Sequence, residues 1–158
     1  MTRAKQFFNA IFAKINDADR AYIKKHLNEA GAKLFYDMEV FDQAHSLAVA
    51  RTIETFDYQG DLEFLIRLAL LHDVGRKNIS VFDKVFFVLI NKASVRLTKK
   101  LSNYFPSLYV CLNHAKIGAE ILKDAGFLRE AEIVGYHHED IDKPNTELLL
   151  LKKADSKN

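Results

Sequence analysis

Polar side chains with metal-binding chemistry stand among apolar residues at helical spacing along most of this sequence. His45 shares one predicted helix face with Phe41 and Val49, and His114 shares another with Val110 and Ile117. Because residues three or four positions apart lie on the same side of a helix, these side chains should point toward a core and away from water. The full set of such residues is His45, His72, Asp73, His114, His137, His138 and Asp155.

Imidazoles and carboxylates that converge from several helices of one small domain are what a metal centre requires. Imidazole nitrogen favours Mn, Fe, Co, Ni or Zn over Mg, and a carboxylate can bridge two ions. Cys111 is the only cysteine, which excludes a structural zinc–thiolate site. The sixth histidine, His26, has Lys24, Lys25 and Asn28 as neighbours, and we expect it at the surface.

Each of these residues also has an interpretation without a metal. A single inward histidine, such as His45 or His114 taken alone, is usually a core residue with a satisfied hydrogen bond. Asp73 follows a very apolar run, where a carboxylate costs several kcal/mol unless it is paired or bound to a cation; a helix cap or a salt bridge would also satisfy it. Asp155 could be solvated near the end of the chain, and His137–His138 could be an exposed pair beside Glu139.

The elements that must position these residues are predicted to be helices. Helical periodicity dominates, strand-like alternation is weak, and 6 Gly and 2 Pro in 158 residues favour long helices with short connections. The segment from Leu62 onward is the most apolar and should be central; Asp61 is suited to cap it. We expect an all-α, compact single-domain bundle of about seven or eight helices, at roughly 7–15, 17–36, 39–56, 62–75, 81–101, 108–124, 128–138 and 144–155.

Length and composition fit an ordinary soluble domain. Apolar residues make up 49% and charged residues 28%, and the formal net charge of +2 is too weak to indicate nucleic-acid binding. One thiol fits a reducing compartment, no stretch resembles a membrane span, and the N-terminal segment lacks a signal-peptide pattern. We therefore expect one cytoplasmic domain over 1–158, in which helices of 1–38 pack on a motif-bearing core at 40–155.

Five segments, taken in order, resemble the HD-domain superfamily and more closely its HDIG-type members. They read QAHSLAVA at 43–50, LLHDVGR at 70–76, HAKIGAEIL at 114–122, GYHHE at 135–139 and LKKAD at 151–155. A bare His-Asp pair would carry little information. Five segments in order, each in a helical context, are a specific pattern.

The resemblance implies a helical metal-dependent phosphohydrolase with two divalent transition-metal ions (Fe, Mn, Zn, Co or Ni, with Mg disfavoured). It would place His45, His72, Asp73 and Asp155 on one ion, with Asp73 bridging to a second ion on His114, His137 and His138. A metal-activated hydroxide would then cleave a phosphoester or phosphoanhydride, with a nucleotide as the expected small substrate. The alternative is a non-catalytic signalling or scaffold domain that retains the metal site.

Two cations just after the His-Asp pair, Arg76 and Lys77, could clamp a substrate phosphate, so we include them with Asp73 as candidate catalytic residues. They could instead be helix-end charges facing water. Glu139 could orient a ligand from outside, or lie at the surface.

The sequence departs from the cyclic-dinucleotide phosphodiesterase branch, which disfavours cyclic di-GMP as substrate. That branch carries Gly-Tyr-Pro after the paired histidines, where this chain continues Asp140-Ile141-Asp142, and it usually has lysine where Arg76 stands. The segment 80–101, apolar early and basic late, could complete the bundle or form a lid, a homodimer face or a membrane-surface contact. We expect neither a transmembrane segment nor binding to duplex nucleic acid.

Overall fold

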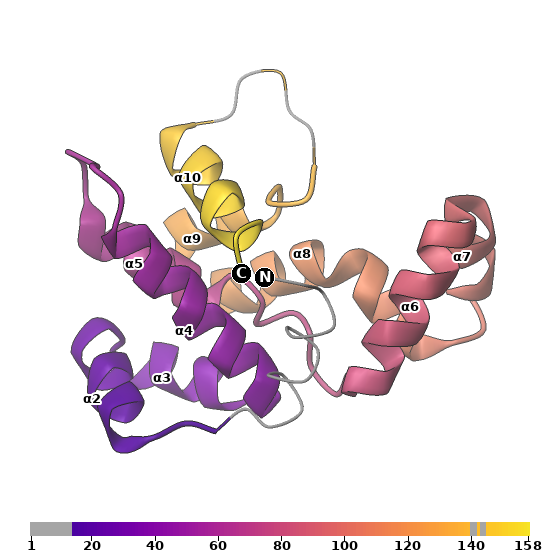
Figure 1. Cartoon of the computed structure of the whole chain (residues 1–158), viewed down its shortest axis with the longest axis horizontal. Coiled ribbons are helices and arrows are strands. Elements are labelled where there is room, and N and C mark those ends of the chain that lie inside the picture. Colours follow the sequence, from indigo (N-terminus) through magenta and orange to yellow (C-terminus); the bar gives the residue numbers. More distant parts are fainter. Residues whose placement is uncertain (1–13, 140–141, 143–144) are drawn as a thin grey trace.

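A computed structural model describes residues 14–139, 142 and 145–158, and in this part of the chain every regular element is a helix (Figure 1). The all-α prediction is therefore confirmed. The helix expected at 7–15 falls almost wholly outside the described residues. The described helices are α2 (Asp17–His26), α3 (Glu29–Tyr36), α4 (Val40–Glu54), α5 (Leu62–Leu71), α6 (Val81–Ala93), α7 (Val95–Leu101), α8 (Pro106–Asp124), α9 (Leu128–Val134) and α10 (Thr146–Asp155).

Short polar side chains begin most of these helices by accepting hydrogen bonds from otherwise unpaired backbone amides. Asn16 accepts from the Asp19 amide, and Asp61 accepts from the Phe64 amide at 2.9 Å, as its position in the sequence predicts. Ser80 and Asp83 form a reciprocal capping box at the start of α6. Pro144, the first residue of the helix expected at 144–155, lies outside the described residues; Asn145 caps α10.

Two predicted helices are each split, and two others end earlier than expected: α5, and α9, which ends at Val134 within the range 128–138. The helix expected at 17–36 breaks where Asn28 caps α3 by accepting from the Gly31 amide. The one expected at 81–101 breaks at Ser94, whose extended backbone ends α6 and whose hydroxyl caps α7. Asn and Ser side chains compete for backbone amides and so favour a new helix start. α5 ends at Leu71, so His72 and Asp73 lie in the turn that follows it.

The most apolar helix, α5, lies at the centre of the core. It packs chiefly against α4 and also contacts α2, α3, α9 and α10 (Figure 1). Leu65, Leu68 and Leu70 are fully buried, together with Val49 and Ile53 of α4. The turn that carries His72 and Asp73 therefore starts from the most firmly packed element of the molecule.

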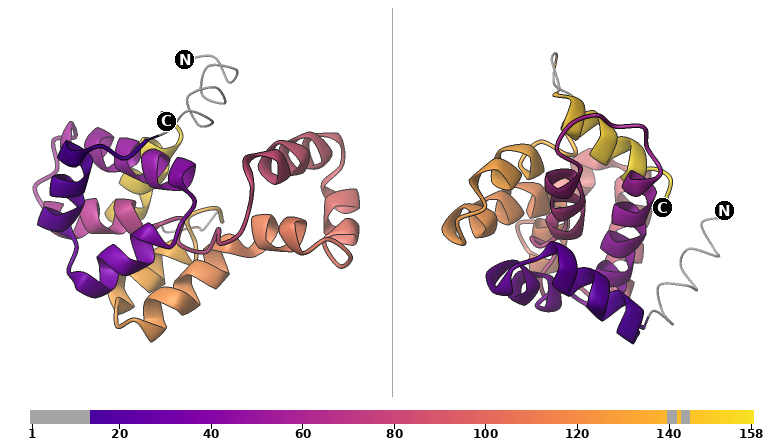
Figure 2. Two further views of the ribbon diagram at one scale, coloured as in Figure 1. Left: turned by 90° about the horizontal axis from the view of Figure 1, so that it is seen from below. Right: turned by 90° about the vertical axis from the view of Figure 1, so that its left-hand side faces the viewer.

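Helices α6 and α7 form an arm that stands out from the other helices (Figures 1 and 2). They pack on each other and on α8. One side chain ties the base of the arm to the core, because Lys84 of α6 lies 2.5 Å from the Asp42 carboxylate of α4.

Candidate metal centre

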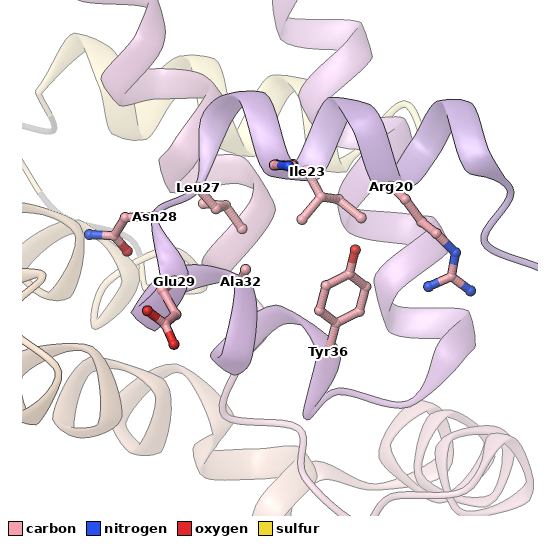
Figure 3. A pocket seen from close by; sticks show the side chains of 8 residues that line it. Arg20, Ile23, Leu27, Asn28, Glu29, Ala32 and Tyr36 are labelled. Atoms are coloured by element: carbon pink, nitrogen blue, oxygen red, sulfur yellow. The ribbon is translucent and has the colours of Figure 1, made fainter.

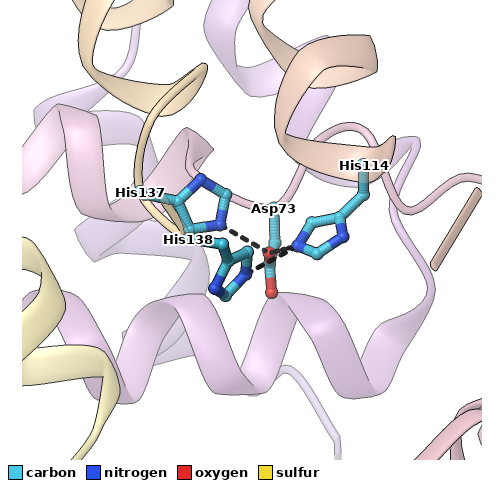
Figure 4. Close-up of side chains that lie close together, drawn as sticks. All are labelled: Asp73, His114, His137 and His138. Carbon is cyan, nitrogen blue, oxygen red and sulfur yellow. Dashed lines mark hydrogen bonds and ion pairs between the residues drawn. The ribbon is translucent and has the colours of Figure 1, made fainter. Parts of the chain in front are cut away.

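All seven predicted ligands come together in two adjoining groups. His45 comes from α4 and His114 from α8, while the others lie in the turns after α5 and α9 or at the end of α10. Within each group, the potential ligand atoms lie within 4.8 Å of one another. One group is Asp73, His114, His137 and His138 (Figure 4), and the other is His45, His72 and Asp155.

Three of the histidines share the same backbone anchor, which fixes their tautomer. In each, Nδ1–H donates to the carbonyl oxygen three residues earlier, which leaves the ring's lone pair on Nε2. This lone pair has no hydrogen-bond partner in His72 and His137, whereas that of His114 faces Arg76 and His138. The distances are 2.8 Å for His72 to Ala69, 2.9 Å for His114 to Cys111 and 2.6 Å for His137 to Val134.

The lone pairs around Asp73 converge without hydrogen bonds to satisfy them. Asp73 is fully buried, and neither of its oxygens accepts a hydrogen bond; the same is true of the buried Nε2 atoms of His72 and His137. Oδ1 lies 3.6 Å from His114 Nε2 and 3.8 Å from His137 Nε2, while Oδ2 lies 3.5 Å from His72 Nε2. The Arg76 guanidinium forms an ion pair with Oδ2 only, while Oδ1 and the Nε2 atoms of His72 and His137 are buried acceptors that face one another without a donor. Such an arrangement needs a further cation, so these residues fit divalent metal ions. Asp73 faces both groups and is placed to bridge them.

The shifted pKa values of the side chains at this centre keep its buried imidazoles neutral and the Asp73 carboxylate ionised, the states in which they bind a cation. Burial lowers the pKa of His114 to about 2, with Arg76 adding to the shift, and lowers that of His137 to about 4. Both imidazoles are therefore neutral, as a metal ligand must be. Burial alone would raise the pKa of Asp73, but the positive charge of Arg76, together with the surrounding imidazoles, outweighs it and holds that pKa well below its usual range.

The remaining two histidines of the centre, His45 and His138, contact side chains instead of backbone carbonyls. His45 Nε2 lies 2.9 Å from Asp155 Oδ1. Burial opposes both charges, but this hydrogen bond raises the pKa of His45 and brings that of Asp155 down to about 2. His138 Nε2 lies 2.9 Å from His114 Nε2; since His114 is protonated on Nδ1, His138 is the donor.

Arg76 reaches the centre, whereas Lys77 does not. The Arg76 guanidinium lies 2.8 Å from Asp73 Oδ2 as an ion pair and 3.2 Å from His114 Nε2. Lys77 instead lies 3.3 Å from Asp37 in an exposed ion pair. Glu139 is half-exposed and pairs with Lys116 at 3.5 Å, while its backbone carbonyl accepts a hydrogen bond from Lys152.

Sequence reasoning missed a second buried carboxylate beside the centre. Asp42 is fully buried, lies 3.8 Å from Arg76 Nη1, and accepts two hydrogen bonds from Lys84 at 2.5 and 2.6 Å. Its position three residues before His45 puts it on the same face of α4, which was the available signal.

The prediction for His26 was wrong. This side chain is 7% exposed, its Nδ1 lies 2.7 Å from Glu63 Oε2, and its ring contacts Tyr22. The adjacent lysines suggested a surface site, but the helix face is set by Tyr22 and Ile23, four and three residues earlier, which point inward.

Close backbone packing brings α8 to the turn that carries Asp73. A Cβ atom on Gly75 would lie 2.0 Å from the His114 carbonyl oxygen and 2.6 Å from the Gly118 amide nitrogen. Only glycine leaves room for this approach, which places His114 against Asp73.

Two surface pockets lie away from these ligands. One, of about 530 Å³, is formed by α2 and α3 with Ile23 and Tyr36 in its lining (Figure 3). The other, of about 660 Å³, lies between α8 and α9 beside Tyr136. None of the seven candidate ligands lines either pocket.

Comparison with known families agrees with this geometry. The HD domain matches residues 43–157, more than half of the chain, and this range includes all seven candidate ligands. The chain belongs to the HD domain family. HD domains are in general metal-dependent phosphohydrolases, and the two buried groups could hold their ions. Comparisons with curated proteins and with solved structures gave no match. Among the described residues of this HD domain, no helix has the length and hydropathy needed to cross a bilayer.

Proposed function

We propose that this HD domain hydrolyses a phosphoester or phosphoanhydride of a small molecule, with a nucleotide as the preferred substrate class. The observation that carries the proposal is the convergence on buried Asp73 of imidazole Nε2 atoms that have no hydrogen-bond partner, with further imidazoles on either side. His45, His72, Asp73 and Asp155 would hold one divalent transition-metal ion, and Asp73, His114, His137 and His138 a second. Such ions act as Lewis acids that activate water and neutralise phosphate oxygens.

The protein's own residues orient the reactants. The backbone-anchored imidazoles of His72, His114 and His137 keep their Nε2 atoms directed inward without any side-chain rearrangement. Arg76 would bind a phosphate at the centre; in support, its side chain is 23% exposed while its guanidinium reaches both Asp73 and His114. When a cation occupies the lone pairs of Asp73 and His114, the donors of Arg76 become free for a bidentate phosphate contact.

Metal content and hydrolysis should be measured on the same preparations. We expect about two transition-metal ions per chain when the protein is purified without chelator, and release of phosphate from nucleotides in their presence. Asp73→Ala should lose both ions and the activity while it remains folded, because Asp73 is the residue shared by the two groups. Asp124→Asn, an exposed carboxylate at the end of α8, is the matched control and should retain both.

The outcomes separate the alternatives. About one ion per chain would restrict the centre to a single group. Folded protein that binds no ion after reconstitution with Mn or Fe would support the non-catalytic HD domain instead. Metal-loaded protein that hydrolyses phosphoesters but no nucleotide would overturn only the substrate class.

A further inference from the structure

The face of α6 that points to water is apolar. Phe82 is 78% exposed, Leu89 63% and Phe86 47%, and these residues recur at the three- and four-residue spacing of one helix face. Of the described side chains of α6 that are exposed, only Lys92 is charged. The solvent-facing side of a surface helix is normally polar, so this stripe requires an occupant.

The charges next to this stripe are all positive. From Lys92 to the end of α7, the exposed charged residues are four cations, and the only acidic residue between 81 and 105 is Asp83, which caps α6. Leu89, Lys92, Val95 and Arg96 lie within eight consecutive residues, so apolar and basic groups meet at the tip of the arm. The four cations are Lys92, Arg96, Lys99 and Lys100.

This charge pattern distinguishes between two partners that could cover the apolar stripe, a second copy of the chain and an anionic membrane. A two-fold contact uses the same patch on both copies, so a second copy would bring this same face, whose only acidic residue is Asp83 at the base of α6, and would offer little to pair with the four cations. An anionic phospholipid surface would instead neutralise the cations and accept the Phe and Leu side chains at the boundary of headgroups and acyl chains. Tyr104 and Phe105, exposed just after α7, are side chains suited to that boundary.

We propose that the α6–α7 arm docks this protein on the surface of anionic phospholipid membranes. The arm packs on α8, which also carries His114, but it stands out from the other helices (Figure 2), so docking through its outer face leaves the seven candidate ligands where they are. Lys84 is not part of the contact, because it is committed to Asp42 at the base of the arm.

Vesicle co-sedimentation of the full chain tests this docking. The probes are vesicles of phosphatidylcholine alone and of phosphatidylcholine mixed with phosphatidylglycerol. We expect binding to the mixed vesicles that weakens as salt is raised. Lys99→Gln with Lys100→Gln should weaken it about 25-fold, from about fivefold per charge at an anionic surface. Phe82→Ser with Phe86→Ser should weaken it at least about tenfold, through the lost apolar burial.

Matched surface variants serve as controls. Leu128→Ser with Leu149→Ser removes exposed apolar residues elsewhere, and Lys24→Gln with Lys25→Gln removes exposed cations of α2; both should bind like the unmodified protein. Circular dichroism of each variant checks folding.

Several results would overturn the proposal. One is an absence of binding to the mixed vesicles. Another is binding that Phe8→Ser with Phe12→Ser abolishes while the arm variants leave it intact. A third is a dimer in light scattering that dissociates on Phe82→Ser with Phe86→Ser, with no vesicle binding; this result would assign the apolar stripe to a second copy.

Discussion

His138 differs from the other imidazoles of its group in the nitrogen it presents. Its Nε2 carries the proton that His114 accepts at 2.9 Å, whereas His114 and His137 carry their proton on Nδ1 and already have the lone pair on Nε2. To ligate through Nε2, His138 must first move that proton to Nδ1. The geometry therefore makes it the weakest ligand of the four.

We expect His138→Ala to weaken metal binding at this group less than His114→Ala does. The difference should reach about tenfold or more, because His114 loses a preorganised ligand and His138 one that must first change tautomer. Metal titration by calorimetry, at a pH where both imidazoles are neutral, measures it. Equal losses in the two variants would contradict the tautomer argument.

A pH effect is expected from Asp42, which faces Lys84, Arg76 and Asp73. Burial raises its pKa from 3.8 to about 6, and Lys84 offsets this only in part. A raised folded-state pKa contributes stability that is complete below about pH 4 and is lost as pH rises through about 6. The loss from this group is about 3 kcal/mol, at 1.36 kcal/mol for each pKa unit.

Urea unfolding of the metal-free protein and of Asp42→Asn, at pH 4 and at pH 7, measures this contribution. The free energy of unfolding of the unmodified protein should fall relative to that of the variant between the two pH values. A difference that stays constant, or changes in the opposite direction, would show that Asp42 is ionised throughout this range.

The sequence predicts which residues of the centre converge better than it predicts what holds them there. The seven ligand positions follow from polar residues set in apolar helical faces, and the structure brings all of them together, while their binding of metal stays a prediction. The sequence did not predict Asp42 as part of the centre, because its partner Lys84 lies 42 residues later in the chain. His26 was misplaced because neighbours in sequence were weighed above neighbours on the helix face.

At the scale of elements, the contact of the turn after α5 with α8 sets the distance between Asp73 and His114. We expect Gly75→Ala to destabilise the protein by at least about 2 kcal/mol, because a Cβ cannot fit 2.0 Å from the His114 carbonyl without a backbone shift. The same shift should weaken metal binding at the group of His114. Urea unfolding and metal titration measure the two effects.

Gly135→Ala is the control for this substitution. A Cβ at Gly135 would have its nearest neighbours at 3.5 Å, and the backbone there is right-handed helical. This variant should be as stable as the unmodified protein, or more stable by about 0.4–1 kcal/mol. If both alanine variants were equally stable, the close approach at Gly75 would not determine the geometry of the site.

Helix type and approximate position follow from periodicity, but helix ends and packing partners do not. The breaks at Asn28 and Ser94 each depend on one side chain that caps a new helix. Neither break interrupts the helical spacing of the apolar residues, so periodicity does not reveal it. Likewise, the apolar face of α6 has the same periodicity as a core helix, so sequence alone favours burial. Only the arrangement of α6, α7 and α8 shows that this face points outward.

At the scale of the whole molecule, metal binding should raise thermal stability. The candidate ligands lie on or just after α4, α5, α8, α9 and α10, so they span most of the chain. An ion that binds only the folded state stabilises it by about 2.7 kcal/mol at 100 times its Kd. For a domain of this size, that corresponds to a rise in Tm of roughly 5–10 °C. Scanning calorimetry with Mn²⁺, against the same protein in chelator, measures it. A rise of equal size in Asp73→Ala would indicate binding elsewhere.

The anchoring of His72, His114 and His137 to carbonyl groups has a consequence for mutational robustness. In many metal sites the orienting acceptor is a side chain, which one substitution can delete. Here each acceptor belongs to the main chain, so no exchange of the residue that supplies it removes the hydrogen bond. A saturation scan should therefore find the three histidines intolerant while Cys111→Ser retains metal, and tolerance at Ala69 and Val134 should be limited by side-chain volume alone. An orientation built into the backbone in this way can persist while the surrounding sequence drifts.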